Sequence, residues 1–156
     1  MIMPPANTPR QRGFGGMLLI ATFGLAVLVF GGILTNSRSL PAPQAEALNI
    51  EIGHNLVAAA GDMPFCVVSR SDSTLRGHYP LEMHALTASL GRAFDGWLIV
   101  PFFEEGGRLT IDGVHYVADH DSLIPASATP CASGSSFGYS TSVMSAWVEE
   151  KSGGQV

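Results

Sequence analysis

Three uninterrupted apolar runs lie at residues 27–34, 65–68 and 97–103 of this chain. Continuous apolar runs without polar alternation are typical of strands that are covered on both faces, as in a parallel sheet. The segments between the runs show apolar residues at helical spacing instead. The resulting order of strand, helix, strand, helix, strand predicts an α/β fold, with a parallel sheet, flanking helices and right-handed crossovers.

Helices are predicted between and after these runs. Pro41 stands where the first helix is expected to begin, because a first helical turn tolerates proline, and Gly61 stands at its expected end. The second helix is predicted over 80–90 and the last one over 141–151.

A β-hairpin is predicted between the second and last helices. Asp112-Gly113 separates two short β-prone runs, Arg108–Ile111 and 114–117, and this dipeptide is a strong hairpin signal. The stretch that follows, 119–136, is rich in Ser, Ala and Pro and is predicted to be a loop.

Polar loops follow the three apolar runs, at 35–38, 70–78 and 104–108. Parallel strands end at the same edge of a sheet, where open α/β sheets bind their ligands. The three loops are therefore predicted to meet at one edge and to form a ligand site there.

The loop at 70–78 has the densest polar chemistry in the chain. Arg70 and Arg76 can each hold a carboxylate or phosphate through paired N–H donors. Gly77 allows the backbone to approach a ligand closely. Hydroxyl groups that suit a sugar are those of Ser71, Ser73 and Thr74. The alternative is an ordinary loop in which Asp72 and the serines cap the next helix.

The charge balance narrows the class of partner. Eight Lys and Arg stand against thirteen Asp and Glu, and the net charge of −5 argues against a nucleic-acid-binding surface. Cys66 lies in an apolar run and is expected to be a small core residue, and no Cys/His spacing indicates a metal site. The sequence also contains neither a Gly-rich phosphate loop nor a dinucleotide fingerprint.

The sequence Ser-Arg-Ser-Asp-Ser-Thr-Leu-Arg-Gly-His-Tyr-Pro at 69–80 resembles the signature of the four-carbon acid sugar kinases, in their amino-terminal, substrate-binding domain. The resemblance extends over roughly residues 33–154, and its Asp-Ser-Thr-Leu-Arg-Gly core is specific. Further segments that match in the same order are 33–38, 100–108, 114–117, 137–139 and 147–151.

The resemblance implies an ATP-dependent kinase that phosphorylates a hydroxyl of a four-carbon sugar acid of the erythronate, threonate or oxo-tetronate type. It implies that Arg70 or Arg76 holds the substrate carboxylate, and that Asp72 either orients a substrate hydroxyl or caps the next helix. The residues carried over as substrate-binding are Asn36, Ser37, Arg38, Arg70, Asp72, Ser73, Thr74, Arg76, Gly77, Gly106, Gly107 and Arg108. The alternatives are a solvated loop arginine for Arg38 and an ordinary turn for the glycine pair.

Two parts of the family pattern are not found in this sequence: an acidic Asp-Asp-x-Thr-Gly motif, and the carboxyl-terminal domain that holds ATP and Mg²⁺. We therefore expect a partial domain over 30–156, after a hydrophobic, non-homologous start over 1–29. The chain is expected to bind a sugar acid, to bind neither ATP nor Mg²⁺ alone, and to need the nucleotide domain in cis or as a separate chain.

Residues 14–34 also admit a different interpretation. They are uncharged over about the 20 residues that cross a bilayer, and arginines precede them, as in a signal peptide or membrane span. The run continues directly into 33–36, which the family pattern treats as a buried strand, so a cytoplasmic protein is expected. The alternative function is a stand-alone module that binds a small hydroxy acid, anchored to a membrane by residues 14–34.

Overall fold

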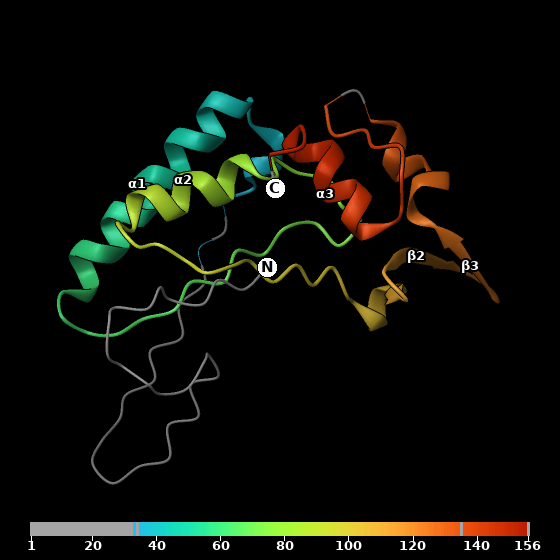
Figure 1. The fold of residues 1–156 in the computed structure, drawn as a ribbon, viewed down its shortest axis with the longest axis horizontal. Coiled ribbons are helices and arrows are strands. Elements are labelled where there is room, and N and C mark those ends of the chain that lie inside the picture. Colours follow the sequence, from blue (N-terminus) through green and yellow to red (C-terminus); the bar gives the residue numbers. More distant parts are fainter. Residues whose placement is uncertain (1–32, 34, 135, 156) are drawn as a thin grey trace, which may run out of the picture.

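The computed structural model describes residues 33, 35–134 and 136–155. Figure 1 shows two helices side by side at one end, a small sheet at the other, and the last helix between them. The helices and strands of the described residues are α1 (Ala42–Ala60), α2 (Leu81–Ser89), β1 (Arg108–Ile111), β2 (Val114–Asp119), β3 (Ser122–Pro125) and α3 (Met144–Ser152).

The predicted helices are confirmed within a few residues at each end. The first, α1, begins after Pro41, and Gly61 ends it with a φ of +52°. It packs against α2 at Gly53, where an added Cβ would lie 1.8 Å from Ser89 Oγ. A side chain at position 53 would therefore separate the two helices.

The predicted hairpin is also confirmed. Asp112 and Gly113 both have positive φ, +49° and +77°, as a type I′ turn requires, and Ile111 pairs with Val114 across it. A third antiparallel strand, β3, pairs with β2 inside the stretch that was predicted to be a loop. The turn that joins these strands has no Asn-Gly or Asp-Gly signal; His120 takes the left-handed conformation there instead.

The expected parallel sheet is not confirmed, although helices and strands give the mixed α/β class that was predicted. Segments 65–68 and 97–103 contain no strand, and only Val68, Leu98 and Phe103 within them form single bridges, that of Phe103 being to Arg108. The sheet in the described residues is the antiparallel β1-β2-β3. The first predicted strand, 27–34, lies outside the described residues except for Ile33.

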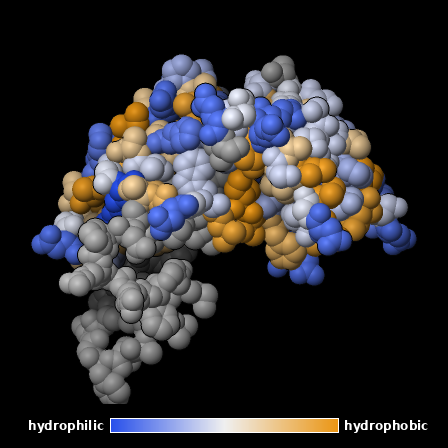
Figure 2. Space-filling view, viewed as in Figure 1, coloured by the Kyte–Doolittle hydropathy of each residue, from blue (hydrophilic) through white to orange (hydrophobic). Residues whose placement is uncertain are grey.

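The prediction that the segments at 65–68 and 97–103 are covered on both faces is wrong. Side chains alternate along an extended chain, and one face of each segment is exposed. The exposed fractions of the large apolar residues are 59% for Val68, 55% for Leu98, 48% for Val100 and 53% for Phe102. Cys66 is exposed as well, so its expected place in the core is also wrong. Figure 2 shows a band of hydrophobic surface in the middle of the molecule, on the face that is in view.

The hydrophobic core lies between α2, α3 and the loop at 69–80. Leu75 and Tyr79 of that loop are buried in it, and the Tyr79 and Trp147 rings lie 4.8 Å apart. The other buried members of the cluster are Met83, Leu86, Ala126, Ala132 and Tyr139. Among the helices that the structure describes, none has the length and apolar character to cross a membrane.

Candidate functional site

Asp72 is the centre of a charged cluster formed by two of the polar loops. One carboxylate oxygen accepts a hydrogen bond from Arg76 Nε at 2.8 Å and another from the Thr74 hydroxyl. The other oxygen lies 3.0 Å from Arg38 Nη1 and 3.4 Å from Arg76 Nη2. The predicted meeting of the loops at 35–38 and 70–78 is thus confirmed.

The cluster carries a net positive charge on a chain that is acidic overall. Burial opposes ionisation of Asp72, but hydrogen bonds from Arg76 and Thr74 and the charges of both arginines outweigh it and lower its pKa. The hydrogen bond to Asp72 raises the pKa of Arg76. Two guanidinium groups and one carboxylate leave one positive charge, and Arg76 uses only its Nε and one Nη2 hydrogen in these bonds.

The loop that carries the cluster has an unusual backbone. Leu75, although buried, takes a left-handed φ of +63°, a conformation that few residues other than glycine adopt. Gly77 has a φ of +139°, and a Cβ there would lie 3.2 Å from Ser71 Oγ. Outliers of this kind concentrate at functional sites, where surrounding contacts hold them.

Two buried side chains from distant parts of the chain hold this backbone. His115 Nε2, from β2, lies 2.7 Å from the carbonyl oxygen of Ser73. The Tyr139 hydroxyl donates to the carbonyl oxygen of Thr74 at 2.9 Å. Neither residue was predicted to contact the loop, and no local signal reveals contacts over 42 and 65 residues of sequence.

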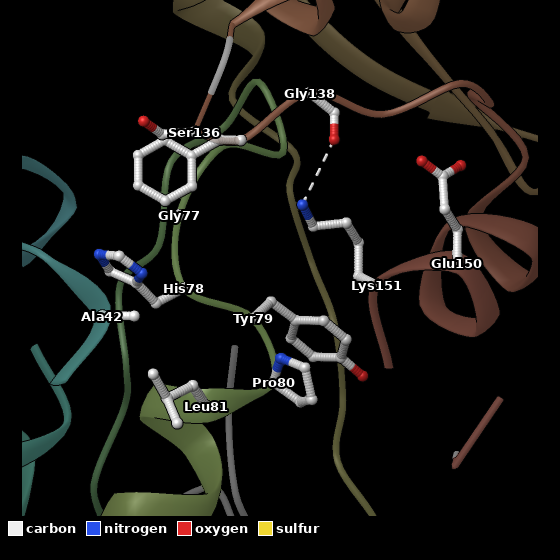
Figure 3. A pocket seen from close by; sticks show the side chains of 11 residues that line it. Ala42, Gly77, His78, Tyr79, Pro80, Leu81, Ser136, Gly138, Glu150 and Lys151 are labelled. Carbon is white, nitrogen blue, oxygen red and sulfur yellow. Dashed lines mark hydrogen bonds between the residues drawn. The ribbon is translucent and has the colours of Figure 1, made fainter. Parts of the chain in front are cut away.

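A cavity of about 430 Å³ is lined in part by Gly77, the residue that follows Arg76 of the cluster (Figure 3). His78 and Phe137 form an edge-to-face ring pair at 4.8 Å, and His78 Nε2 lies 2.9 Å from the carbonyl oxygen of Leu40. Lys151 Nζ donates to the Gly138 carbonyl oxygen at 3.4 Å. The lining residues are Ala42, Gly77, His78, Tyr79, Pro80, Leu81, Ser136, Phe137, Gly138, Glu150 and Lys151.

Two charged residues of α3, Glu150 and Lys151, line the cavity and do not form an ion pair with each other. The Glu150 carboxylate accepts hydrogen bonds from the backbone N–H and the hydroxyl of Ser140, at 2.6–3.1 Å. No ion pair joins Glu150 to Lys151 within the residues that the structure describes. Glu150 and Lys151 were not predicted to belong to the site, because α3 lies far along the chain from the signature.

The structure brings some of the predicted site residues together and leaves others apart. It brings Arg38, Asp72, Thr74 and Arg76 together, and Gly77 borders the cavity. Ser73 takes part through its carbonyl, whereas Asn36 and Ser37 neighbour Arg38 in a short 3-10 turn. Arg70 is exposed, and no hydrogen bond or ion pair of its side chain is seen among the described residues.

Gly106, Gly107 and Arg108 lie at the turn before β1. Gly107 has a φ of +69°, its carbonyl accepts from Ala118 N–H at 2.7 Å, and a Cβ on it would approach Ala118 Cβ to 2.9 Å. The Arg108 guanidinium donates to the Gly106 carbonyl oxygen. Within the described part of the chain, no hydrogen bond or ion pair links these three residues to Asp72, so their contacts are those of a tight turn.

Metal binding has no obvious place in this arrangement. In residues 33, 35–134 and 136–155, no group of three or more His, Cys, Asp or Glu side chains is placed to hold a metal ion. The donors at the site are cationic or neutral N–H and O–H groups, which suit an anionic, hydroxylated ligand.

Comparison with known proteins agrees with this chemistry. A family model described as a sugar-binding N-terminal domain matches residues 19–156 of the chain. The match begins within the apolar stretch 14–34 and includes every predicted site residue. No curated protein and no solved structure matches the chain.

Proposed function

Because the chain belongs to the family of sugar-binding N-terminal domains of the four-carbon acid sugar kinases, we propose that it binds the sugar-acid substrate of an ATP-dependent kinase. The substrate in this proposal is a four-carbon acid of the erythronate, threonate or oxo-tetronate type. The carboxylate binds to an arginine of the loop at 69–80, and the hydroxylated carbons lie toward the cavity at Gly77.

The cluster around Asp72 is the observation that carries the proposal. Its net positive charge, on a chain with a net charge of −5, favours an anion at this place. Arg76 is held in position by Asp72 while its remaining N–H donors are available to a second carboxylate. Arg70, exposed in the same loop, is the second candidate for the carboxylate.

Asp72 has a second role in the proposal. Because its pKa is lowered, the carboxylate is ionised at neutral pH and accepts hydrogen bonds only. A substrate hydroxyl that donates to it is thereby oriented beside the arginines. The hydroxyl of Ser136 and the ring of Phe137 offer a polar and an apolar contact on the cavity wall.

The phosphoryl donor is expected to bind elsewhere. Phosphoryl transfer depends on positioning and on charge neutralisation by cations and Mg²⁺, and the sequence contains no phosphate loop for this purpose. We therefore expect the nucleotide-binding domain of the family to supply ATP and Mg²⁺. The purified chain should bind sugar acid without transferring phosphate from ATP.

Titration calorimetry with erythronate and threonate tests the proposal. Arg70→Ala and Arg76→Ala should separately reveal which arginine holds the carboxylate, since loss of a charge-assisted pair weakens binding by about 10- to 100-fold. Arg92→Ala is the matched control, because Arg92 lies over the Phe65 ring and donates to the Phe65 carbonyl, away from the site.

The outcomes separate clearly. Weaker binding in Arg70→Ala or Arg76→Ala, with Arg92→Ala unchanged, supports the proposed site. A wild-type chain that binds neither acid, or an equal loss in all three variants, contradicts it.

A further inference from the structure

We propose that His115 and Tyr139 are positioning residues for the sugar-acid site. Each holds one of two consecutive carbonyls of the signature loop, and together they fix the place of the Asp72 carboxylate and the Arg76 guanidinium. The inference rests on the proposed function, since the ligand is the sugar acid, but the two contacts can be tested independently of it.

Both ring nitrogens of His115 form hydrogen bonds within the protein. The ring is fully buried, with Nε2 2.7 Å from the Ser73 carbonyl oxygen and Nδ1 2.9 Å from Thr110 Oγ1. A carbonyl can only accept, so Nε2 carries the hydrogen and Nδ1 accepts from the Thr110 hydroxyl. With neither nitrogen available to a ligand, His115 acts on the loop and not on the substrate.

Tyr139 holds the next carbonyl in the same way. Its hydroxyl is 2.9 Å from the Thr74 carbonyl oxygen and 3.3 Å from that of Ala126, and the residue is only 6% exposed. Burial raises the pKa of Tyr139 to about 12, so the phenol remains protonated and is a donor at every physiological pH. Tyr139 follows Phe137 and Gly138 of the cavity wall, so the same segment shapes the cavity and the loop.

The two anchored peptides lie between the functional side chains. The Ser73–Thr74 peptide follows Asp72, and the Thr74–Leu75 peptide precedes Arg76 by one residue. Leu75 takes its left-handed conformation directly after them, which requires support from surrounding contacts. A buried carbonyl without a donor is costly, so removal of either anchor should shift the loop and move the cluster.

The hairpin therefore has a role beyond its own stability. His115 lies on β2, and its backbone N–H donates to the Ser142 carbonyl at 2.8 Å, just before α3. The hairpin thus connects the signature loop on one side to the segment that carries the cavity wall on the other.

The experiment combines ligand binding with NMR of the loop amides. Tyr139→Phe removes one oxygen atom, and His115→Leu removes the Nε2 donor together with the Nδ1 acceptor. Each should raise the dissociation constant for erythronate or threonate by about tenfold. Thr74 and Leu75, whose N–H groups belong to the anchored peptides, should shift in ¹H–¹⁵N spectra: Thr74 in the His115 variant and Leu75 in the Tyr139 variant.

Two controls distinguish positioning from a general loss of stability. His115→Gln keeps a side-chain N–H and should retain binding within about threefold of wild type. Tyr116→Phe removes a hydroxyl from the same strand and should change neither binding nor the two amide signals. Thermal unfolding of each variant verifies that the binding data come from folded chains.

The result can fail in distinguishable ways. Wild-type affinity in folded Tyr139→Phe and His115→Leu would overturn the positioning role. If the wild-type chain binds neither acid, the proposed function fails, while unchanged Thr74 and Leu75 signals in the variants would separately refute the anchors. Loss of binding in His115→Gln equal to that in His115→Leu would also contradict the inference, because the donor would then be irrelevant.

Discussion

The signature loop and the extended segments 65–68 and 97–103 have opposite surroundings. The loop is polar in sequence, yet Thr74, Leu75, Gly77 and Tyr79 are buried in it. The extended segments are apolar in sequence, yet alternate side chains are exposed along their length. Figure 2 shows the hydrophobic surface in the middle of the molecule.

The contrast shows that burial follows from available neighbours and not from residue type. The loop is covered by α2, α3, the hairpin and the 126–139 segment, all of which follow it in the chain. Segment 97–103 contacts the core through Trp97 and Ile99, whereas Leu98, Val100 and Phe102 on its other face, like Val68 of the segment at 65–68, are exposed.

The largest expected effect comes from making the same substitution in the core that covers the loop, at Leu86 of α2, and in an extended segment, at Leu98. Leu86→Ala should lower the free energy of unfolding by about 2–5 kcal/mol, because Leu86 is only 3% exposed and a cavity would remain. Leu98→Ala, at 55% exposure, should cost less than about 1 kcal/mol. Urea unfolding measures both, and equal losses would mean that Leu98 is covered in solution.

A close helix contact gives the next effect. Gly53→Ala should destabilise the α1–α2 packing by about 1–3 kcal/mol, because the new methyl group would overlap the Ser89 side chain. Thermal unfolding measures the change. Adding Ser89→Gly removes both overlapping atoms and should recover part of the loss; no recovery would show that the contact at Ser89 is not the cause.

The pH dependence of stability tests the burial of His115. Burial lowers the pKa of His115, and the positive charge of Arg108 lowers it further. The hydrogen bond to the Ser73 carbonyl raises this pKa, but by less than burial lowers it. The unfolded chain then binds a proton that the folded chain does not, so the stabilisation is present above pH 6.5 and declines below it, with a slope of at most about 1.4 kcal/mol per pH unit.

Unfolding titrations between pH 5 and 7 measure this slope. His115→Gln should flatten it, because a glutamine side chain binds no proton in this range. A slope that survives in His115→Gln would assign the proton to another group.

The smallest effect is expected at the edge of the charged cluster. Arg38→Ala removes an ion pair whose arginine side chain is 43% exposed, and should cost less than about 1 kcal/mol. A double-mutant cycle with Asp72→Asn isolates the pair, and the coupling should shrink at high salt. A coupling that salt does not change would place the pair in a drier environment than its exposure indicates.

Local sequence signals predicted the elements that depend on neighbouring residues. Pro41 and Gly61 bracket α1, and Asp112-Gly113 forms the turn of the hairpin, because capping and turn chemistry act within a few residues. The same locality explains the failures. Nothing near His120 identifies the turn before β3, and an apolar run cannot tell one covered face from two.

The candidate site was predicted in part for the same reason. The motif at 69–80 indicated its chemistry. The meeting of the loops at 35–38 and 70–78 was predicted from a parallel sheet; Arg38 does contact Asp72, although the sheet in the described residues is antiparallel. The roles of His115 and Tyr139 were not predicted from the sequence, because their hydrogen-bond partners lie 42 and 65 residues away.

The amino-acid sequence by itself determined the family, the helices, the hairpin turn and the residues that suit a sugar acid. Those depend on side-chain chemistry and on backbone preferences over short stretches. Only the tertiary structure decided which carbonyls His115 and Tyr139 hold, where the cavity opens, and which apolar faces are exposed. These features arise where segments distant in sequence pack together, because a hydrogen bond or a covered surface exists only when both partners are in place.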